Sequence, residues 1–389
     1  MFQLYLKGIG MLVGMIFGAG IFALPYAFSH SGLFWGMVHF AIALFITIAL
    51  GFLYGEVAYY TRGKHRFTGY AGIFLGNKTK HFAFLTTLAS YYGSLLVYGL
   101  LGGLFISNFF NHGSYRFEIS ILFFIVSGIF VAFNFKKIAD INFYLTVPIF
   151  GFIIYLLFIA LPAIKIDNFF SNLYFSFNND WFLPYGVWIF ALGGAAVIPE
   201  VRDLFSSFPL KHLKRVIWVS TVLCALFSLI FGLAVWGAGN NSTTPDALSG
   251  IAKILGNRAF LVGSLIGFLA VFTSFLALAV NMRNIFRYDY GVSGFSSWFF
   301  TVIPPLGLFL LGAVDFVRTI SFIGALGLGT AGVLIILIAR SMRKRIAAGD
   351  PGDLLKPDKG EYMKPTRLFE RLVLVGVLSG AIYELWRIF

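Results

Sequence analysis

The chain has 389 residues, of which 59% are hydrophobic and only 12% carry a charge. A soluble globular protein cannot bury that much apolar surface, so the composition indicates an integral membrane protein whose partner is the lipid bilayer. The formal net charge of +13 does not indicate nucleic acid binding, because the Lys and Arg residues lie in short clusters between apolar stretches.

Apolar stretches of about 20 residues, the length that a helix needs to cross a bilayer, recur along the whole chain. They predict an all-α membrane protein with about eleven transmembrane helices. The stretches are 6–29, 33–60, 81–110, 117–135, 142–163, 183–206, 214–238, 257–282, 296–314, 320–340 and 369–388. The polar segment 341–368 is expected to be a cytoplasmic linker, and 369–389 a peripheral eleventh helix.

The distribution of positive charge predicts the orientation. With the N-terminus inside, most of the 29 Lys and Arg residues fall on the inner side. The outer segments then contain only Arg116, Lys165, Lys253, Arg258, Arg318 and Arg387. Because Lys and Arg are enriched in cytoplasmic loops, this asymmetry predicts a multi-pass protein of the cell membrane with its N-terminus inside and its C-terminus outside.

The first stretch contains residues that interrupt a helix. Gly14, Gly18 and Gly20 lie close together, and Pro25 follows. Glycine is entropically costly in a helix and proline lacks a backbone donor, so we expect a break near 18–20. A broken helix is tolerated at membrane depth only where protein or a water-filled cavity surrounds it, which makes the break a candidate binding site. The alternative is that these small residues only allow close helix packing.

The sixth stretch contains a second segment of this kind, with Gly193 and Gly194 followed by Pro199. The two interrupted stretches are separated by an odd number of helices. Residues 1–165 and 181–340 are therefore predicted to be two five-helix repeats that lie inverted in the membrane. Interrupted helices at corresponding positions of two halves indicate a transporter's binding site.

Segment 18–28, with the sequence GAGIFALPYAF, resembles the G-x-G-I-x-A-L-P-x-A signature that opens two permease families. These are the amino acid/auxin permease and the hydroxy/aromatic amino acid permease families of the amino acid-polyamine-organocation superfamily. Segment 54–71 resembles the end of the second helix and its inner loop in prokaryotic members. The resemblance implies the LeuT-like fold, with a 5+5 inverted repeat, discontinuous helices 1 and 6, and one additional helix.

The resemblance also implies how a substrate amino acid binds. Its α-carboxylate would lie near the backbone amides of the first break, and its amino group near carbonyls of both breaks. The small residues of the sixth helix would leave room for the side chain, and the third helix would line the pocket. The expected substrate-binding residues are Gly18, Ala19, Gly20, Tyr91, Ala191, Gly193, Gly194 and Ala195.

For the coupling ion, the resemblance implies a sodium site in which oxygen atoms from two helices surround a hard cation. The expected ligands are Gly14, Phe17, Ala270, Thr273 and Ser274. Alternatively, the two hydroxyl groups bond back to their own helix. A lysine on the fifth helix, which occupies this place in proton-coupled relatives, is missing here.

Glu200 is the candidate proton carrier, because it follows the second break, where a carboxylate titrates or pairs with Arg202. The sequence therefore predicts a secondary active transporter for a neutral amino acid with a hydrophobic or aromatic side chain. Coupling to Na⁺ or H⁺ is expected, with no other cofactor. The alternatives are a proton-coupled permease, an exchanger, a substrate sensor or a membrane-embedded enzyme, although no metal-ligand cluster or nucleotide loop supports an enzyme.

Overall fold

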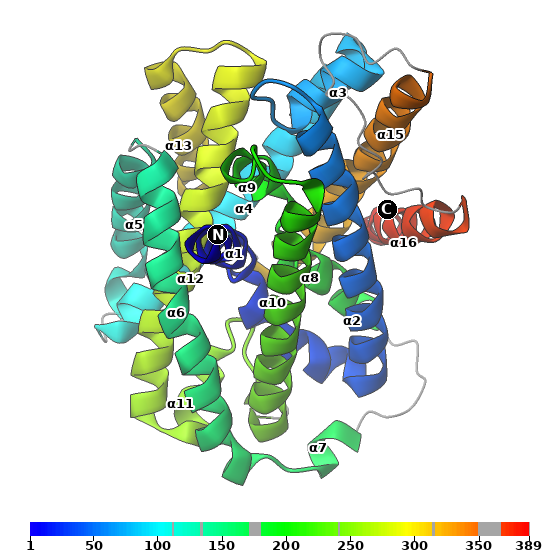
Figure 1. Cartoon of the computed structure of the whole chain (residues 1–389). Coiled ribbons are helices and arrows are strands. Elements are labelled where there is room, and N and C mark those ends of the chain that lie inside the picture. The colour runs from blue at the N-terminus through cyan, green and yellow to red at the C-terminus, as the bar shows by residue number, and fades with distance from the viewer. Residues whose placement is uncertain are drawn as a thin grey trace.

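The computed structural model describes residues 1–110, 113–132, 135–170, 180–239, 242–312, 316–348 and 367–388. In this part of the chain the regular elements are helices, and most of them run up and down a single bundle (Figure 1). The short helices α7 (Asp167–Phe170) and α11 (Leu248–Leu255) lie at the lower end of the bundle, and α3 (Phe67–Leu75) lies at the upper end.

Each of the eleven predicted stretches coincides with one helix or with a pair of helices. These are α1 (Phe2–Ile16), α2 (Gly20–Tyr60), α4 (Asn77–Phe109), α5 (Arg116–Val131), α6 (Phe135–Ala160), α8 (Leu183–Ala191), α9 (Ile198–Leu204), α10 (Leu210–Gly239), α12 (Asn257–Asn284), α13 (Gly294–Leu310), α14 (Phe316–Phe322), α15 (Leu328–Ala347) and α16 (Arg367–Ile388). By length and composition alone, seven helices of the described residues can cross a membrane. Others, such as α1, are apolar but shorter, because a break ends α1 early.

Both predicted breaks are present. Helix α1 ends at Ile16, Phe17 leaves the helical conformation with a ψ of 78°, and α2 begins at Gly20. Helix α8 ends at Ala191, and α9 begins only at Ile198 after an irregular segment and a short 3₁₀ turn. Pro25 lies inside α2, so the glycines and not the proline mark the break.

The structure differs from the sequence prediction in three details. Helix α2 covers both the end of the first predicted stretch and the whole of the second. The two parts are joined by a turn at Gly32, where φ is +80°. The tenth stretch contains an unpredicted π-helical segment, Ile323–Gly327, between α14 and α15. Helix α15 continues to Ala347, into the predicted linker, and residues 349–366 of that linker lie outside the described residues.

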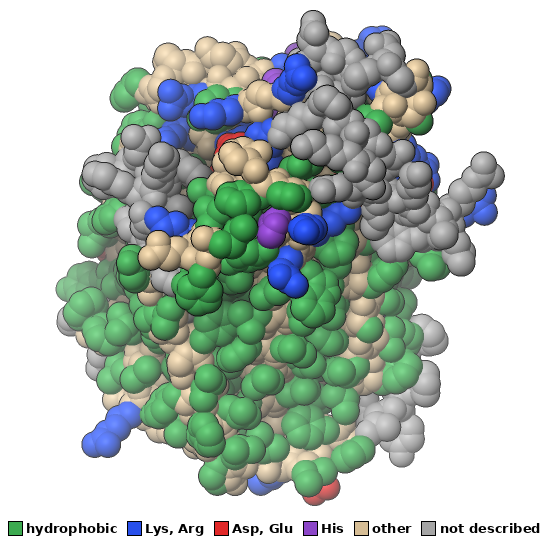
Figure 2. Space-filling model, viewed as in Figure 1, with side chains coloured by type: hydrophobic (Ala, Val, Ile, Leu, Met, Phe, Trp, Pro, Cys, Tyr) green, Lys and Arg blue, Asp and Glu red, His purple; other side chains and the backbone are tan. Residues whose placement is uncertain are grey.

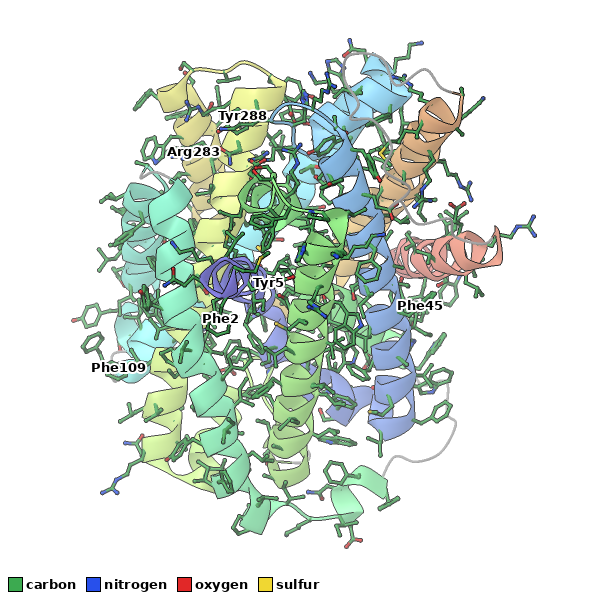
Figure 3. The ribbon with its side chains drawn as sticks, in the orientation of Figure 1. Phe2, Tyr5, Phe45, Phe109, Arg283 and Tyr288 are labelled. Carbon is green, nitrogen blue, oxygen red and sulfur yellow. The ribbon has the colours of Figure 1, made fainter. Side chains whose placement is uncertain are left out.

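The surface matches a protein surrounded by lipid. Hydrophobic side chains cover the middle of the face in Figure 2, whereas Lys and Arg gather toward its upper end. Phe45 and Phe109, 41% and 37% exposed, point outward from the sides of the bundle (Figure 3). Helix α16 lies at the side of the bundle against α15 and α2. Its Gly376 carbonyl accepts a hydrogen bond from the Tyr185 hydroxyl at 2.6 Å.

Candidate functional site

The two breaks touch each other in the middle of the bundle. A Cβ atom on Gly20 would lie 2.5 Å from the Cα of Ala191, a distance at which only glycine fits. A Cβ atom on Gly194 would similarly lie 2.7 Å from the side chain of Ile16. The glycines of both breaks therefore allow the two interrupted helices to approach closely.

A cavity lies beside this contact, between the second break and helices α4, α12 and α15. Its lining from α4 comprises Thr87, Ser90, Tyr91, Ser94 and Tyr98, and from α8 and the second break Phe190, Gly193, Ala195 and Ala196. The unpredicted π-helical segment adds Ile323 and Gly327. Among the described residues, the lining contains aromatic, aliphatic, small and hydroxyl side chains and no charged one.

The predicted substrate residues divide into three groups. Tyr91, Gly193 and Ala195 line the cavity, and Gly194 lines a second cavity, which Gly193 and Ala195 also border. The remaining four lie at the contact of the two breaks and are absent from the lining of the central cavity. They are Gly18, Ala19, Gly20 and Ala191.

One backbone donor of the first break is already used. The amide of Gly18 donates to the carbonyl of Ile16 at 2.9 Å. The first N–H groups of any helix lack an acceptor within that helix, and α2 begins here. Of the predicted residues in the first break, Ala19 and Gly20 are therefore the ones whose amides lie at the start of α2 without an acceptor in that helix.

Ser274 of α12 lies among carbonyl oxygens of α1. Its Oγ lies 3.0 Å from the carbonyl oxygen of Gly14, 3.1 Å from that of Met15 and 3.2 Å from that of Phe17. A hydroxyl group has one proton, so three acceptors exceed what it can satisfy. A Cβ atom on Gly18 would lie 2.6 Å from this Oγ, so the glycine allows α12 to approach.

Thr273 behaves differently from its neighbour. Its Oγ1 donates to the carbonyl of Ala270 at 2.9 Å, which is the intrahelical bond that the sequence left open. The structure therefore brings together the predicted oxygen atoms of α1 and Ser274, and it adds Met15, which the sequence did not indicate. Such a cluster of carbonyl and hydroxyl oxygens suits a hard monovalent or divalent cation.

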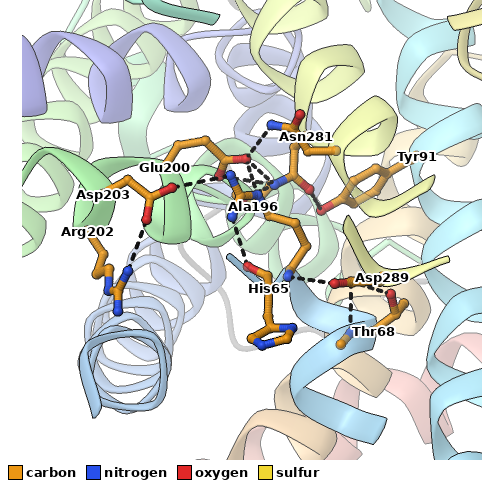
Figure 4. A network of polar contacts seen from close by, with 12 residues as sticks. His65, Thr68, Tyr91, Ala196, Glu200, Arg202, Asp203, Asn281 and Asp289 are labelled. Carbon is orange, nitrogen blue, oxygen red and sulfur yellow. Dashed lines mark hydrogen bonds and ion pairs between the residues drawn. The ribbon is translucent and has the colours of Figure 1, made fainter. Parts of the chain in front are cut away.

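Glu200 is 1% exposed and forms part of a buried polar network (Figure 4). The Nε of Arg66 donates to its Oε1 at 2.5 Å, and the amides of Asn281 and Asn284 each donate to the same oxygen at 3.1 Å. The partner suggested from sequence, Arg202, instead pairs with Asp203 and donates to the carbonyl of Thr61.

Arg66 lies in the loop between α2 and α3 and is 3% exposed. Burial alone would lower the pKa of Arg66, but the carboxylates of Glu200 and Asp203 outweigh this effect and raise it. The buried guanidinium pairs with Glu200 and Asp203, because an unpaired buried charge is costly.

Asp289 holds the same loop from the other side. Its carboxylate accepts hydrogen bonds from the backbone amides of Arg66 and Gly69, at 3.0 and 2.8 Å, and from the hydroxyl of Thr68 at 2.6 Å. A carboxylate at the start of α3 also favours that helix electrostatically. Sequence reasoning missed Arg66, Asn281, Asn284 and Asp289. The available signal was the run of polar side chains between 281 and 289.

Two interrupted helices that meet beside an uncharged cavity, in a bundle with an apolar girdle, define a membrane transporter of the LeuT-like fold. The solved structure of MhsT in complex with L-phenylalanine is similar, with a TM-score of 0.66 and 18% identity over 98% of this chain and 97% of that one. Mhp1, a nucleobase-cation-symport-1 family transporter solved in a closed conformation with bromovinylhydantoin bound, matches at a TM-score of 0.69 and 13% identity over 98% and 91%.

The family model of the tryptophan/tyrosine permease family matches residues 2–349. The chain belongs to this family, which confirms the resemblance of segment 18–28. It is an amino acid permease and not an enzyme. A search of curated proteins found no match.

Proposed function

We propose that this permease carries an aromatic amino acid across the membrane by alternating access, with the substrate bound between the two breaks. The observation that supports this most is the uncharged central cavity, which is lined by the small residues Gly193 and Ala195 together with the aromatic residues Tyr91, Tyr98 and Phe190. A charged side chain in this cavity would need a buried partner, which the lining does not offer. An aromatic ring gains both apolar burial and ring contacts.

The backbone of the breaks supplies the polar half of the site. The substrate's α-carboxylate would accept from the amides of Ala19 and Gly20 at the start of α2, where the helix dipole is positive. Its ammonium group would donate to carbonyl oxygens of the irregular segments. The ring would lie beside Gly193, in the cavity that Leu328 also lines. L-phenylalanine in the similar MhsT structure supports a substrate of this chemistry.

Sodium is the proposed coupling ion. The carbonyl oxygens of Gly14, Met15 and Phe17 converge on Ser274, whose single hydroxyl proton cannot satisfy all three. A cation would satisfy them all, and it would link α1 to α12. Glu200 is the proton-coupled alternative. In the structure its carboxylate pairs with the guanidinium of Arg66.

The proposed orientation has the N-terminus inside and the C-terminus outside. The upper end of the bundle in Figure 2, where Lys and Arg gather, would then face the cytoplasm. In this arrangement residues 1–165 and 181–340 are the two inverted repeats, each of which opens with a discontinuous helix.

A binding panel tests the substrate assignment. We expect tryptophan, tyrosine or phenylalanine to raise the melting temperature of the purified protein selectively among the twenty amino acids. Gly193→Val should abolish that shift while the protein stays monodisperse, because a Cβ on Gly193 would already lie 3.0 Å from Leu328. Selective stabilisation by lysine, arginine or glutamate would refute the assignment, as would unchanged binding by folded Gly193→Val.

A further inference from the structure

Asn281 of α12 is 2% exposed and connects the central cavity to the buried ion pair. Its Nδ2 donates to the carbonyl of Ala196 at 2.7 Å and to both carboxylate oxygens of Glu200 at 3.1 Å. Its Oδ1 accepts from the hydroxyl of Tyr91 at 3.0 Å. Figure 4 shows the side chain between these three groups.

The chemistry of the partners determines which way the amide points. A backbone carbonyl and a carboxylate only accept hydrogen bonds, so the NH₂ group must face Ala196 and Glu200. The amide oxygen then faces Tyr91, whose hydroxyl must donate. Every hydrogen-bonding group of the Asn281 side chain is therefore engaged, and a buried group that lost its partner would be costly.

The partners of Asn281 belong to two different parts of the protein. Tyr91 and Ala196 line the cavity. Glu200 is paired with Arg66, which comes from the loop between α2 and α3 at the upper end of the bundle. The network thus ties α9, α12 and this loop together, and that end cannot open while the bonds hold.

We propose that Asn281 is a positioning residue through which substrate in the cavity controls the Arg66–Glu200 ion pair. This inference rests on the proposed function. A substrate ring that displaces the Tyr91 hydroxyl leaves the Asn281 oxygen without a donor, and an amide that turns to find another donor no longer donates to Glu200. A ligand shifts a conformational equilibrium only through contacts that differ between the two states. Asn281 contacts cavity-lining groups on one side and Glu200 on the other, so a change in the cavity reaches the ion pair.

Asn284 is the matched control. It lies on the same helix, is 3% exposed, and its Nδ2 donates to Glu200 Oε1 at 3.1 Å. It shares with Asn281 only this bond to Glu200. Replacing Asn284 weakens the ion-pair network without touching the groups that line the cavity, whereas replacing Asn281 removes the connection itself.

The reporter is a cysteine at Thr61, which follows α2 at the upper end of the bundle, is 1% exposed and lies outside the cavity lining, in a Cys224→Ser background. The rate of its reaction with a small thiol reagent measures opening, and aromatic amino acid binding is measured in parallel. We expect substrate to change this rate when Asn281 is intact. Asn281→Ala should raise the rate without substrate about tenfold or more, the equivalent of one lost hydrogen bond to a charged group, and should abolish the response to substrate.

Asn284→Ala should also raise the basal rate but keep the response to substrate. Tyr91→Phe, which removes only the hydroxyl that donates to Asn281, should raise the basal rate and weaken any further response to substrate; it also serves if Asn281→Ala is not monodisperse. A full response in Asn281→Ala or in Tyr91→Phe, while substrate still binds, overturns this inference alone. Failure of the reporter protein with intact Asn281 to bind any aromatic amino acid overturns the proposed function and the inference together.

Discussion

At the scale of single residues, the oxygen cluster around Ser274 illustrates what local sequence reveals. Thr273 and Ser274 are adjacent to each other on one helix, so their pattern was recognisable. In the structure Thr273 donates within α12, whereas Ser274 donates across to α1. We therefore expect the proposed sodium site to depend more on Ser274 than on its neighbour.

Replacing Ser274 tests this difference. Ser274→Ala should raise the sodium concentration for half-maximal uptake by about tenfold, comparable to one lost interaction with a charged group, and Thr273→Ala should raise it less. Ser264→Ala removes a buried hydroxyl from the same helix away from the cluster and serves as the control. Full uptake in choline buffer driven by a pH gradient, together with an inactive Glu200→Gln variant, would assign the coupling to protons instead.

The partner of Glu200 in its ion pair could not be predicted from the sequence, and the reason is physical. Arg202 is its neighbour along the chain, so it was the obvious partner. The true partner, Arg66, is 134 positions away and is brought close only because α9 packs against α2, which the loop of Arg66 follows. Buried charges select partners by three-dimensional geometry, which sequence spacing reveals only within one helix.

At the scale of elements, the two breaks were predictable because their cause is local. Clustered glycines disfavour a continuous helix wherever they occur. The π-helical segment Ile323–Gly327 was not predicted, although Gly324 and Gly327 lie within it. Its geometry depends on neighbours, since a Cβ on Gly324 would overlap the backbone of Gly186, and a Cβ on Gly327 would overlap Ser90. Close packing between helices that are distant along the chain produces no periodic pattern in the sequence from which it could be predicted.

The contact between the breaks gives a prediction at this scale. Gly20→Ala should destabilise the protein by about 1–3 kcal/mol and abolish substrate binding, because the new methyl group meets the backbone of Ala191. Gly151→Ala, within helix α6 and with open space around its Cβ, should be neutral or stabilising by about 0.4–1 kcal/mol. Denaturation in detergent compares the two variants. Equal stability and equal binding would show that the helices do not approach so closely.

At the scale of the whole molecule, hydropathy located all eleven helical stretches, since a bilayer requires long apolar helices. The element boundaries and the pairing of helices came from the structure. The orientation is a prediction from charge, and the structure places two suitable reporter positions at opposite ends of the bundle. Ser242 follows α10 at the lower end, and Ala347 ends α15 at the upper end; both are exposed.

Cysteines at these positions test the orientation. In a Cys224→Ser background, an impermeant thiol reagent added to intact cells should label Ser242→Cys and leave Ala347→Cys unlabelled until the cells are permeabilised. Cys224 itself is fully buried, and its removal leaves the introduced cysteine as the only thiol. The reverse labelling pattern would mean that the N-terminus lies outside.

Uptake by the purified protein in sealed proteoliposomes tests the proposed transport most directly. With an inward sodium gradient, a radiolabelled aromatic amino acid should accumulate inside to a concentration above that outside, and dissipating the gradient should release it. The predicted driving force is the gradient of sodium, the cation that the oxygen atoms around Ser274 would bind. Equilibration to equal concentrations, whatever sodium or proton gradient is imposed, would contradict coupled transport and leave a passive carrier or a sensor.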